Sequence, residues 1–242
     1  MIKKYELTDD IMTHEGHTLY RIKALKDFGE LKTGAIGGWI ESEGNLSQDG
    51  KCWVKDNAMV YGHAYVHEDA WVYRNAKVRG NANISGKAHI SGSAEVYGNA
   101  RVTDAALVFE NAKIYGDANI GGVAWIQGMS IIKDKAKVYG HALVDENAMV
   151  YCQASVFGDV RIFGNSKIYG NATVCGKSSV SENSEVYGNA IVQDWAFIRD
   201  ESKIYGNAVV KGFTCTYCNA EIAGDRVAEN TEITLNNEEH PR

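Results

Sequence analysis

The sequence has almost no proline, no strong charge of either sign and no long apolar run, and each absence excludes a class of protein. Proline occurs once, at Pro241, so nearly every backbone amide is able to donate to a sheet. The net charge of −6 argues against a general nucleic-acid binder, because neutralising phosphates needs a basic surface. No apolar run is long enough to span a membrane.

The first residues and the cysteines give no sign of export or of a metal site. Residues 1–6 (MIKKYE) are not followed by the apolar core of a signal peptide, so we expect a cytoplasmic protein. The five cysteines are an odd number, which suits free thiols in a reducing compartment. Cys215 and Cys218 form a CxxC pair, but zinc needs about four ligands and the sequence has no second pair. We therefore expect no metal and no cofactor.

What the sequence does contain is a six-residue repeat, kept without a miss from Val54 to Val210. Every sixth residue is Val or Ile, and branching at Cβ suits these residues to a pleated strand. A small residue lies two positions earlier, as Ala58 does before Val60, and shares its face of the strand. Gly often lies two positions later, as at Gly62, where a positive φ lets the chain turn a corner. A short strand and a corner every six residues predict a solenoid.

A second period, of eighteen residues, gives the number of sides in each coil. On one side the residue after the inward Val or Ile is usually Tyr, whereas the equivalent residues of the other two sides are mixed. Stacked positions are thus eighteen residues apart, so three six-residue sides close a coil. Stacked aromatic residues on adjacent rungs are expected to stabilise a corner rather than to bind a ligand. This aromatic ladder comprises Tyr61, Tyr97, Tyr115, Tyr151, Tyr169, Tyr187 and Tyr205.

The predicted fold is all-β, a single-stranded parallel β-helix with three sides per coil and about nine regular coils. Residues 1–52 do not follow the period and are predicted to form a β-hairpin and a cap, because an open solenoid end exposes an unpaired strand. The hexapeptide-repeat β-helix is expected over residues 53–224. Residues 225–242 are expected to form a C-terminal cap and a polar tail.

Two features of the sequence resemble a known family. The repeat resembles that of the hexapeptide-repeat proteins, whose fold is a left-handed parallel β-helix, although Gly here follows the aliphatic residue by two positions rather than one. RIKALxDF at 21–28, KxG at 32–34, GGWI at 37–40 and LSQxGxCW at 46–53 resemble the start of the YdcK-like proteins of bacteria and phages. Members of that group are often labelled as transferases. The left hand and a homotrimer are implied by the resemblance alone.

The outer surface of the side that begins at Val54, called side 1 below, predicts an interface. The residues just before the inward aliphatic are mostly large and apolar on side 1, and are more mixed and polar on the other two sides. The inward Val and Ile residues already supply a core, so the fold does not need this stripe, and an exposed patch of such size marks a contact surface. The alternative is that the N-terminal segment covers part of it. The expected interface residues are Trp53, Trp71, Tyr73, Leu107, Phe109, Trp125, Leu143, Phe163 and Phe197.

The sequence suggests few candidates for catalysis, and none is assigned as catalytic. His63, His67, His89 and His141 are not paired in sequence with an obvious nucleophile or carboxylate, so we expect solvated outward side chains. The resembling acyltransferases place a His and an acyl-CoA between subunits, and many extrude a loop that would break the period. The resembling carbonic anhydrases bind zinc through three His, and no third His lies two coils beyond His63 or His67.

Three functions are weighed on these grounds. The first is a non-catalytic solenoid that acts as an oligomeric scaffold or protein-interaction module through side 1, with a homotrimer favoured over another protein partner. One alternative is an acyltransferase-like enzyme with a site between subunits. The other is an acidic inhibitor that occupies the nucleic-acid site of a host complex. Neither a membrane nor nucleic acid itself is an expected partner.

Overall fold

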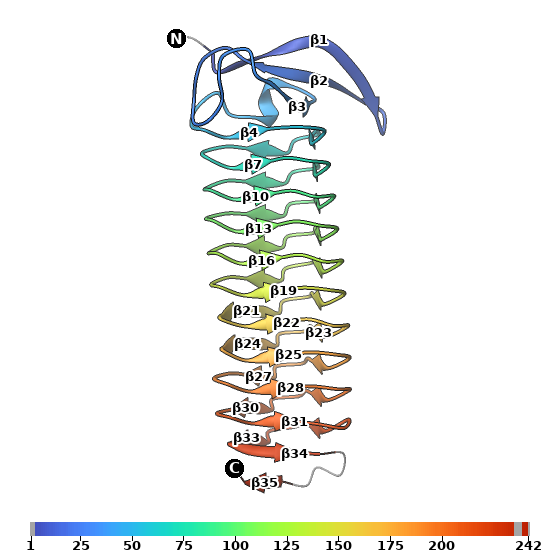
Figure 1. The fold of residues 1–242 in the computed structure, drawn as a ribbon. Helices are drawn as coiled ribbons and strands as arrows, with labels where there is room; N and C mark the ends of the chain where they lie inside the picture. Colours follow the sequence, from blue (N-terminus) through green and yellow to red (C-terminus); the bar gives the residue numbers. More distant parts are fainter. Residues whose placement is uncertain (1–2, 235–238, 242) are drawn as a thin grey trace. The chain divides into compact units, whose positions relative to one another are not determined.

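The computed structural model describes residues 3–234 and 239–241, and the chain divides into two compact units, residues 1–117 and 118–242. Each unit is a stack of short parallel strands on three sides, which confirms the predicted parallel β-helix (Figure 1). Among the described residues, helical structure is limited to one 3-10 turn, η1 (Glu43–Asn45).

Unit 1 begins with an antiparallel sheet and continues as coils. Its side 1 consists of β4 (Trp53–Val54), β7 (Trp71–Val72), β10 (His89–Ile90) and β13 (Leu107–Val108). Its side 2 consists of β1 (Tyr5–His14), β2 (His17–Ala24), β3 (Ile36–Ile40), β5 (Met59–Val60), β8 (Lys77–Val78), β11 (Glu95–Val96) and β14 (Lys113–Ile114). Its side 3 consists of β6 (Tyr65–Val66), β9 (Asn83–Ile84) and β12 (Arg101–Val102).

Unit 2 has the same three sides. Its side 1 consists of β16 (Trp125–Ile126), β19 (Leu143–Val144), β22 (Arg161–Ile162), β25 (Ser179–Val180), β28 (Phe197–Ile198), β31 (Cys215–Thr216), β34 (Thr231–Ile233) and the antiparallel β35 (Glu239–Pro241). Its side 2 consists of β17 (Ile131–Ile132), β20 (Met149–Val150), β23 (Lys167–Ile168), β26 (Glu185–Val186), β29 (Lys203–Ile204) and β32 (Glu221–Ile222). Its side 3 consists of β15 (Asn119–Ile120), β18 (Lys137–Val138), β21 (Ser155–Gly158), β24 (Thr173–Gly176), β27 (Ile191–Val192), β30 (Val209–Lys211) and β33 (Val227–Glu229).

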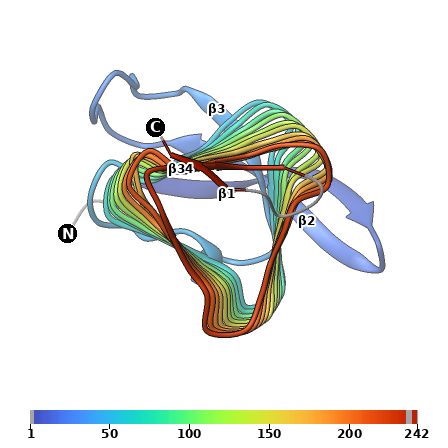
Figure 2. The same cartoon turned by 90° about the horizontal axis from the view of Figure 1, so that it is seen from below.

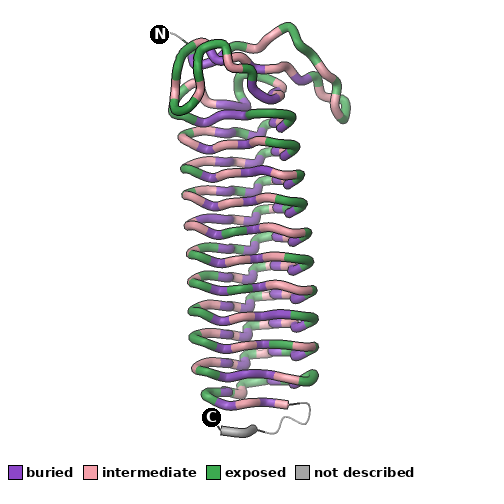
Figure 3. The backbone as a smooth tube through the Cα atoms, viewed as in Figure 1, coloured by how far each residue is buried: buried purple, intermediate pink, exposed green. Residues whose placement is uncertain are grey.

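The core of each unit consists of the small and branched residues that the repeat predicted to point inward. Strands pair with the strand one coil further on, as Trp125 does with Leu143, so equivalent residues stack. Val138 is fully buried and Ile120 is 1% exposed. Buried and exposed residues therefore alternate along every coil (Figure 3). An aliphatic interior of this kind leaves the outward residues free to serve other purposes.

The corners require a left-handed backbone whether or not glycine is present. Gly62 has a φ of 67°, and Asp56, at the equivalent corner position, has a φ of 59°. Acidic residues with this left-handed backbone accept a hydrogen bond from the same corner of the next coil. The backbone N–H of Gly164 donates to Glu146 Oε2 at 2.9 Å, and that of Asp200 donates to Glu182 Oε2 at 3.0 Å. Part of the acidic excess of the chain thus holds successive corners together.

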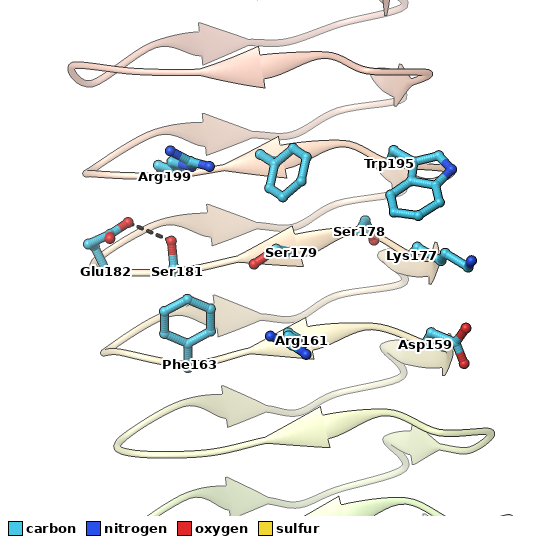
Figure 4. Close-up of a pocket in the computed structure, with 11 residues that line it drawn as sticks. Asp159, Arg161, Phe163, Lys177, Ser178, Ser179, Ser181, Glu182, Trp195 and Arg199 are labelled. Atoms are coloured by element: carbon cyan, nitrogen blue, oxygen red, sulfur yellow. Dashed lines mark hydrogen bonds between the residues drawn. The ribbon is translucent and has the colours of Figure 1, made fainter.

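The coils of unit 2 wind to the left. In Figure 4, Asp159, Arg161 and Phe163 run from right to left across the near face, and the next coil, with Ser179, lies above them. A coil that climbs while it runs from right to left on its near side is left-handed, as the family resemblance implied. Viewed along the coil axis, the coils of each unit have a three-sided outline, and the β1–β2 hairpin of unit 1 extends beyond it (Figure 2).

The N-terminal segment forms the predicted hairpin and also the first coil of unit 1. The hairpin turns at Glu15 and Gly16, whose φ values of 50° and 84° suit a two-residue turn. Strand β3 then pairs parallel with β5, joining Ile40 to Val60, and so belongs to a coil of 20 residues. That length hides the coil from a search for period six.

The strands of unit 2 continue beyond residue 224, where the repeat was expected to end. Val210 pairs with Ala228 in β33, and Thr216 pairs with Ile233 in β34. Ala228 and Ile233 take the inward positions and are buried. The second of these spacings is one residue short of eighteen, so the sequence period does not reveal it.

Candidate interaction surface on side 1

The structure removes Trp53 from the predicted interface. Its side chain is fully buried, with the ring centroid 5.4 Å from that of Phe28 and 6.3 Å from that of Tyr5, both in edge contacts. Gly37 lies against the same ring, since a Cβ on it would lie 2.6 Å from Trp53 Cζ2. The N-terminal segment therefore covers the beginning of side 1, and Trp53 is a core residue of unit 1.

The remaining large side chains on side 1 of unit 1 lie at the surface. Trp71, Tyr73, Leu107 and Phe109 are all partly exposed. Tyr73 meets His89 edge to face with ring centroids 5.9 Å apart, and burial lowers the pKa of His89. A polar wall formed by Lys51, Asp69 and Lys87, among others, borders a hollow of about 400 Å³ beside Trp71 and His89.

On side 1 of unit 2, Trp125 is the most exposed of the predicted residues. It is 49% exposed, and Leu143 on the next coil is partly exposed. These two residues line a hollow of about 490 Å³ together with Val123, His141, Asp159 and Arg161. His141 and Asp159, one coil apart at the same corner, thus share a hollow on side 1 of unit 2, as His89 and Asp69 do on side 1 of unit 1.

A second hollow of about 540 Å³ lies further along side 1 of unit 2, where Ser179 is placed between larger neighbours (Figure 4). One wall consists of Arg161 and Phe163 on the preceding coil, and the other contains Phe197 on the following coil. The remaining lining residues are Asp159, Lys177, Ser178, Ser181, Glu182, Trp195 and Arg199. The predicted interface residues Phe163 and Phe197 therefore border a recess rather than a flat contact.

Two exposed aromatic residues at this end of unit 2 were missed at the sequence level. Trp195 is 44% exposed and Phe213 is 53% exposed, and their rings stack with centroids 6.1 Å apart. Lys177 Nζ lies 4.5 Å from the centroid of the Trp195 ring. All three occupy the corner between sides 3 and 1, eighteen residues apart, so the corner column would have revealed them.

The tyrosine ladder is present in both units, and Tyr61 is separate from it. Tyr97 and Tyr115 stack at 4.8 Å in unit 1. In unit 2 the ladder Tyr151, Tyr169, Tyr187 and Tyr205 has successive centroid spacings of 4.9, 4.8 and 5.0 Å. Tyr61 is instead buried beneath the hairpin and donates its hydroxyl to Glu15 at 3.0 Å. Burial, with that hydrogen bond, raises the pKa of Tyr61 to about 12.

The candidate histidines are dispersed over the surface. His63 and His141 are exposed, whereas His67 stacks on Tyr65 at 4.8 Å and hydrogen-bonds Asn83 at 3.2 Å. Within the described ranges, no group of three or more His, Cys, Asp and Glu side chains is arranged to hold a metal ion. The same part of the chain holds no helix with the length and apolarity needed to cross a bilayer.

Comparisons with known proteins give one partial relative and several structural neighbours. No family model matches the chain. An Escherichia coli K12 protein described as "Uncharacterized acetyltransferase YdcK" is 34% identical over 70 residues, which are 25% of this chain and 22% of that protein. The chain thus spans about a fifth of the length of this relative.

Solved structures of UDP-N-acetylglucosamine acyltransferases resemble the chain weakly. The Francisella novicida enzyme has 18% identity and a TM-score of 0.36 over 76% of this chain and 70% of its own. The Campylobacter jejuni enzyme has 13% identity and a TM-score of 0.37 over 77% and 72%. The repeat, the coil geometry and the 70-residue match agree with one another: the chain is a hexapeptide-repeat β-helix, and part of it is similar to the E. coli YdcK protein.

Proposed function

We propose that this protein is a non-catalytic β-helical scaffold that associates with copies of itself through side 1. The observation that carries the proposal is Trp125, a tryptophan with about half of its surface in water on a regular β side. Tryptophan is costly to leave exposed and is enriched at the centres of protein interfaces. The coil core is complete without it, because Ile126 supplies the inward residue of that strand.

The surroundings of Trp125 suit a protein contact. Val123 and Leu143 extend its apolar surface, and the hollow beside them offers room for a side chain of a second copy. Rigid strands hold these groups in place, so association would order few side chains and lose little conformational entropy. We further propose a trimer, in which each copy presents the same surface to the next around a closed ring.

The test is the molar mass in solution. We expect wild-type protein to be an oligomer by light scattering, and Trp125→Glu to be a monomer with an unchanged β-sheet circular dichroism spectrum. A carboxylate placed in a dry contact without a partner is strongly unfavourable. Phe157→Glu is the matched control, because Phe157 is 44% exposed but lies in β21 on side 3. A monomeric wild type, or a Trp125→Glu variant of wild-type mass, would refute the proposal.

An acyltransferase with a site between subunits is the second candidate, favoured by the pair His141 and Asp159. Both line the hollow next to Trp125, on the surface that we propose to be an interface. A His beside a carboxylate is the arrangement of a general base and its orienting group. Acetyl-CoA should then raise the thermal midpoint, because a ligand of the native state stabilises it, and His141→Asn should abolish acetyl transfer. Absence of both effects leaves the scaffold.

The acidic inhibitor of a nucleic-acid-binding complex remains a prediction. Several carboxylates that would form its anionic surface are used at corners, as Glu146 and Glu182 are. Side 2 of unit 2 carries charges of both signs, as where Lys167 pairs with Glu185 at 3.0 Å, and this reduces the negative potential with which the surface could imitate a nucleic acid. Competition against DNA for a purified nucleic-acid-binding protein would test it.

A further inference from the structure

In the outward row of side chains on side 1 of unit 2, one position holds a small residue where the other positions hold large ones. The outward residues before the inward aliphatics are Trp125, Leu143, Arg161, Ser179 and Phe197 in successive coils. Ser179 is the small member of this row, and the hollow of about 540 Å³ lies over it. Arg161 and Phe197 are thus two coils apart, with only the hydroxymethyl group of Ser179 between them.

The tyrosine ladder of the same unit shows what such a gap accommodates. Tyr169 and Tyr187 stack at 4.8 Å with their ring planes 5° apart. Two rungs therefore span roughly 10 Å, and a planar ring at the level of Ser179 would lie one ladder spacing from each neighbour. Such a ring would stack on Phe197 on one face and on the Arg161 guanidinium on the other, contacts that aromatic rings favour.

The charges around the gap favour an anion. The hollow is lined by three basic residues, Arg161, Lys177 and Arg199, and by two acidic ones, Asp159 and Glu182. The Glu182 carboxylate is already engaged, because Ser181 Oγ donates to it at 2.5 Å and the Asp200 N–H at 3.0 Å. The Arg161 side chain is exposed and makes no ion pair within the described ranges. A guanidinium in that state is available for a bidentate contact with phosphate or carboxylate.

We propose that the Ser179 hollow binds a small molecule made of a planar ring that carries a phosphate or carboxylate group. The ring takes the place of the missing rung between Arg161 and Phe197. The anionic group lies against Arg161, with Lys177 or Arg199 as a second cation. This recess shares Asp159 and Arg161 with the hollow beside Trp125, so the ligand site and the proposed interface are tested separately below.

Calorimetric titration with phenyl phosphate tests the proposal. We expect saturable binding of phenyl phosphate, and of benzoate if a carboxylate suffices. Inorganic phosphate lacks the ring and benzyl alcohol lacks the charge, so each should bind at least about tenfold more weakly, a difference of about 1.4 kcal/mol. Equal binding of inorganic phosphate would show a simple anion site and overturn the stacked ring.

Variants locate the site. Ser179→Phe inserts a ring in the gap, so it should abolish binding while the thermal midpoint stays equal or rises. Ser155→Phe is the matched control, because Ser155 holds the same repeat position in β21 on side 3, and it should bind as wild type does. Arg161→Gln keeps the recess and should weaken binding about tenfold through loss of the charged contact. Wild-type affinity in both Ser179→Phe and Arg161→Gln would refute the site.

Measurements on the Trp125→Glu variant separate this site from the proposed assembly. Binding that is equal in wild type and Trp125→Glu supports the hollow whatever the oligomeric state. Binding to Trp125→Glu but not to wild type would show that association covers the recess. Absence of phenyl phosphate binding from both proteins refutes the ligand site, and it leaves the result of the light-scattering experiment unaffected.

Discussion

The tyrosine ladder of unit 2 gives a prediction whose size follows from the structure. Tyr169 stacks on Tyr151 at 4.9 Å and on Tyr187 at 4.8 Å, and its hydroxyl donates to Glu185 at 2.8 Å. Each stacked pair on adjacent strands contributes about 0.2–1 kcal/mol. A hydrogen bond to a charged group contributes about 1.5 kcal/mol. Tyr169→Ala should therefore lower the free energy of unfolding by about 2–3.5 kcal/mol.

Tyr205 is the matched control at the end of the same ladder. It stacks on one ring, Tyr187 at 5.0 Å, and its hydrogen bond to Glu221 is longer, at 3.3 Å. Tyr205→Ala should thus lower the free energy of unfolding by about 1 kcal/mol, no more than half the effect at Tyr169. Tyr169→Phe keeps both stacks and should lose only the hydroxyl contribution.

Urea unfolding followed by circular dichroism measures these differences. The double variant Tyr169→Ala, Tyr187→Ala completes a cycle, and its cost should be smaller than the sum of the single costs, because the two rings share one stacked contact. Equal costs for Tyr169→Ala and Tyr205→Ala would refute the ladder as a source of stability. A Tyr169→Phe cost as large as that of Tyr169→Ala would assign the effect to the hydroxyl alone.

Two further predictions concern the core and the pH dependence. Val138→Asp should unfold unit 2 at least locally, seen as loss of β-sheet circular dichroism, because a buried carboxylate has no partner among aliphatic residues; outward Lys137→Asp on the same strand should leave the spectrum unchanged. Burial raises the pKa of Tyr151, Tyr169 and Tyr187 above the ordinary 10.0, so the unfolded chain releases these protons first. The stability that these protonated tyrosines contribute is fully present below pH 10 and is lost as the pH rises above it. The thermal midpoint should therefore fall above pH 10, and it should fall less steeply in Tyr169→Phe. A thermal midpoint that does not change above pH 10 would contradict this prediction.

The interior and the corners of this protein could be predicted from the sequence because their contacts repeat at a fixed spacing. A period of six decides which residues point inward, and a period of eighteen decides which residues stack. Val138 in the core and the stack of Tyr169 on Tyr187 follow from these two numbers alone. Strand pairing between successive coils keeps the spacing constant, so an error in register would expose a whole row of Val and Ile.

The N-terminal contacts could not be predicted in this way, because they join residues at irregular separations. Lys4 Nζ donates to the carbonyl of Cys52 at 3.1 Å, and Phe28 packs on Trp53. Burial lowers the pKa of Lys4 there. The sequence placed Trp53 in the exposed stripe of side 1 because its position in the repeat is the same as that of Trp71. Only the path of residues 3–52 shows that a cap covers the first ring and leaves the second partly open.

What the sequence determined by itself is the direction of each side chain, inward or outward, along the repeat. The tertiary structure alone decided how much water an outward side chain meets, because exposure depends on the sizes of its neighbours one coil before and one coil after. Trp125 is about half exposed, and Ser179 lies in a recess between Arg161 and Phe197. The period determines the position of each outward side chain. The volumes of the residues stacked around it determine whether the surface protrudes or is recessed at that position.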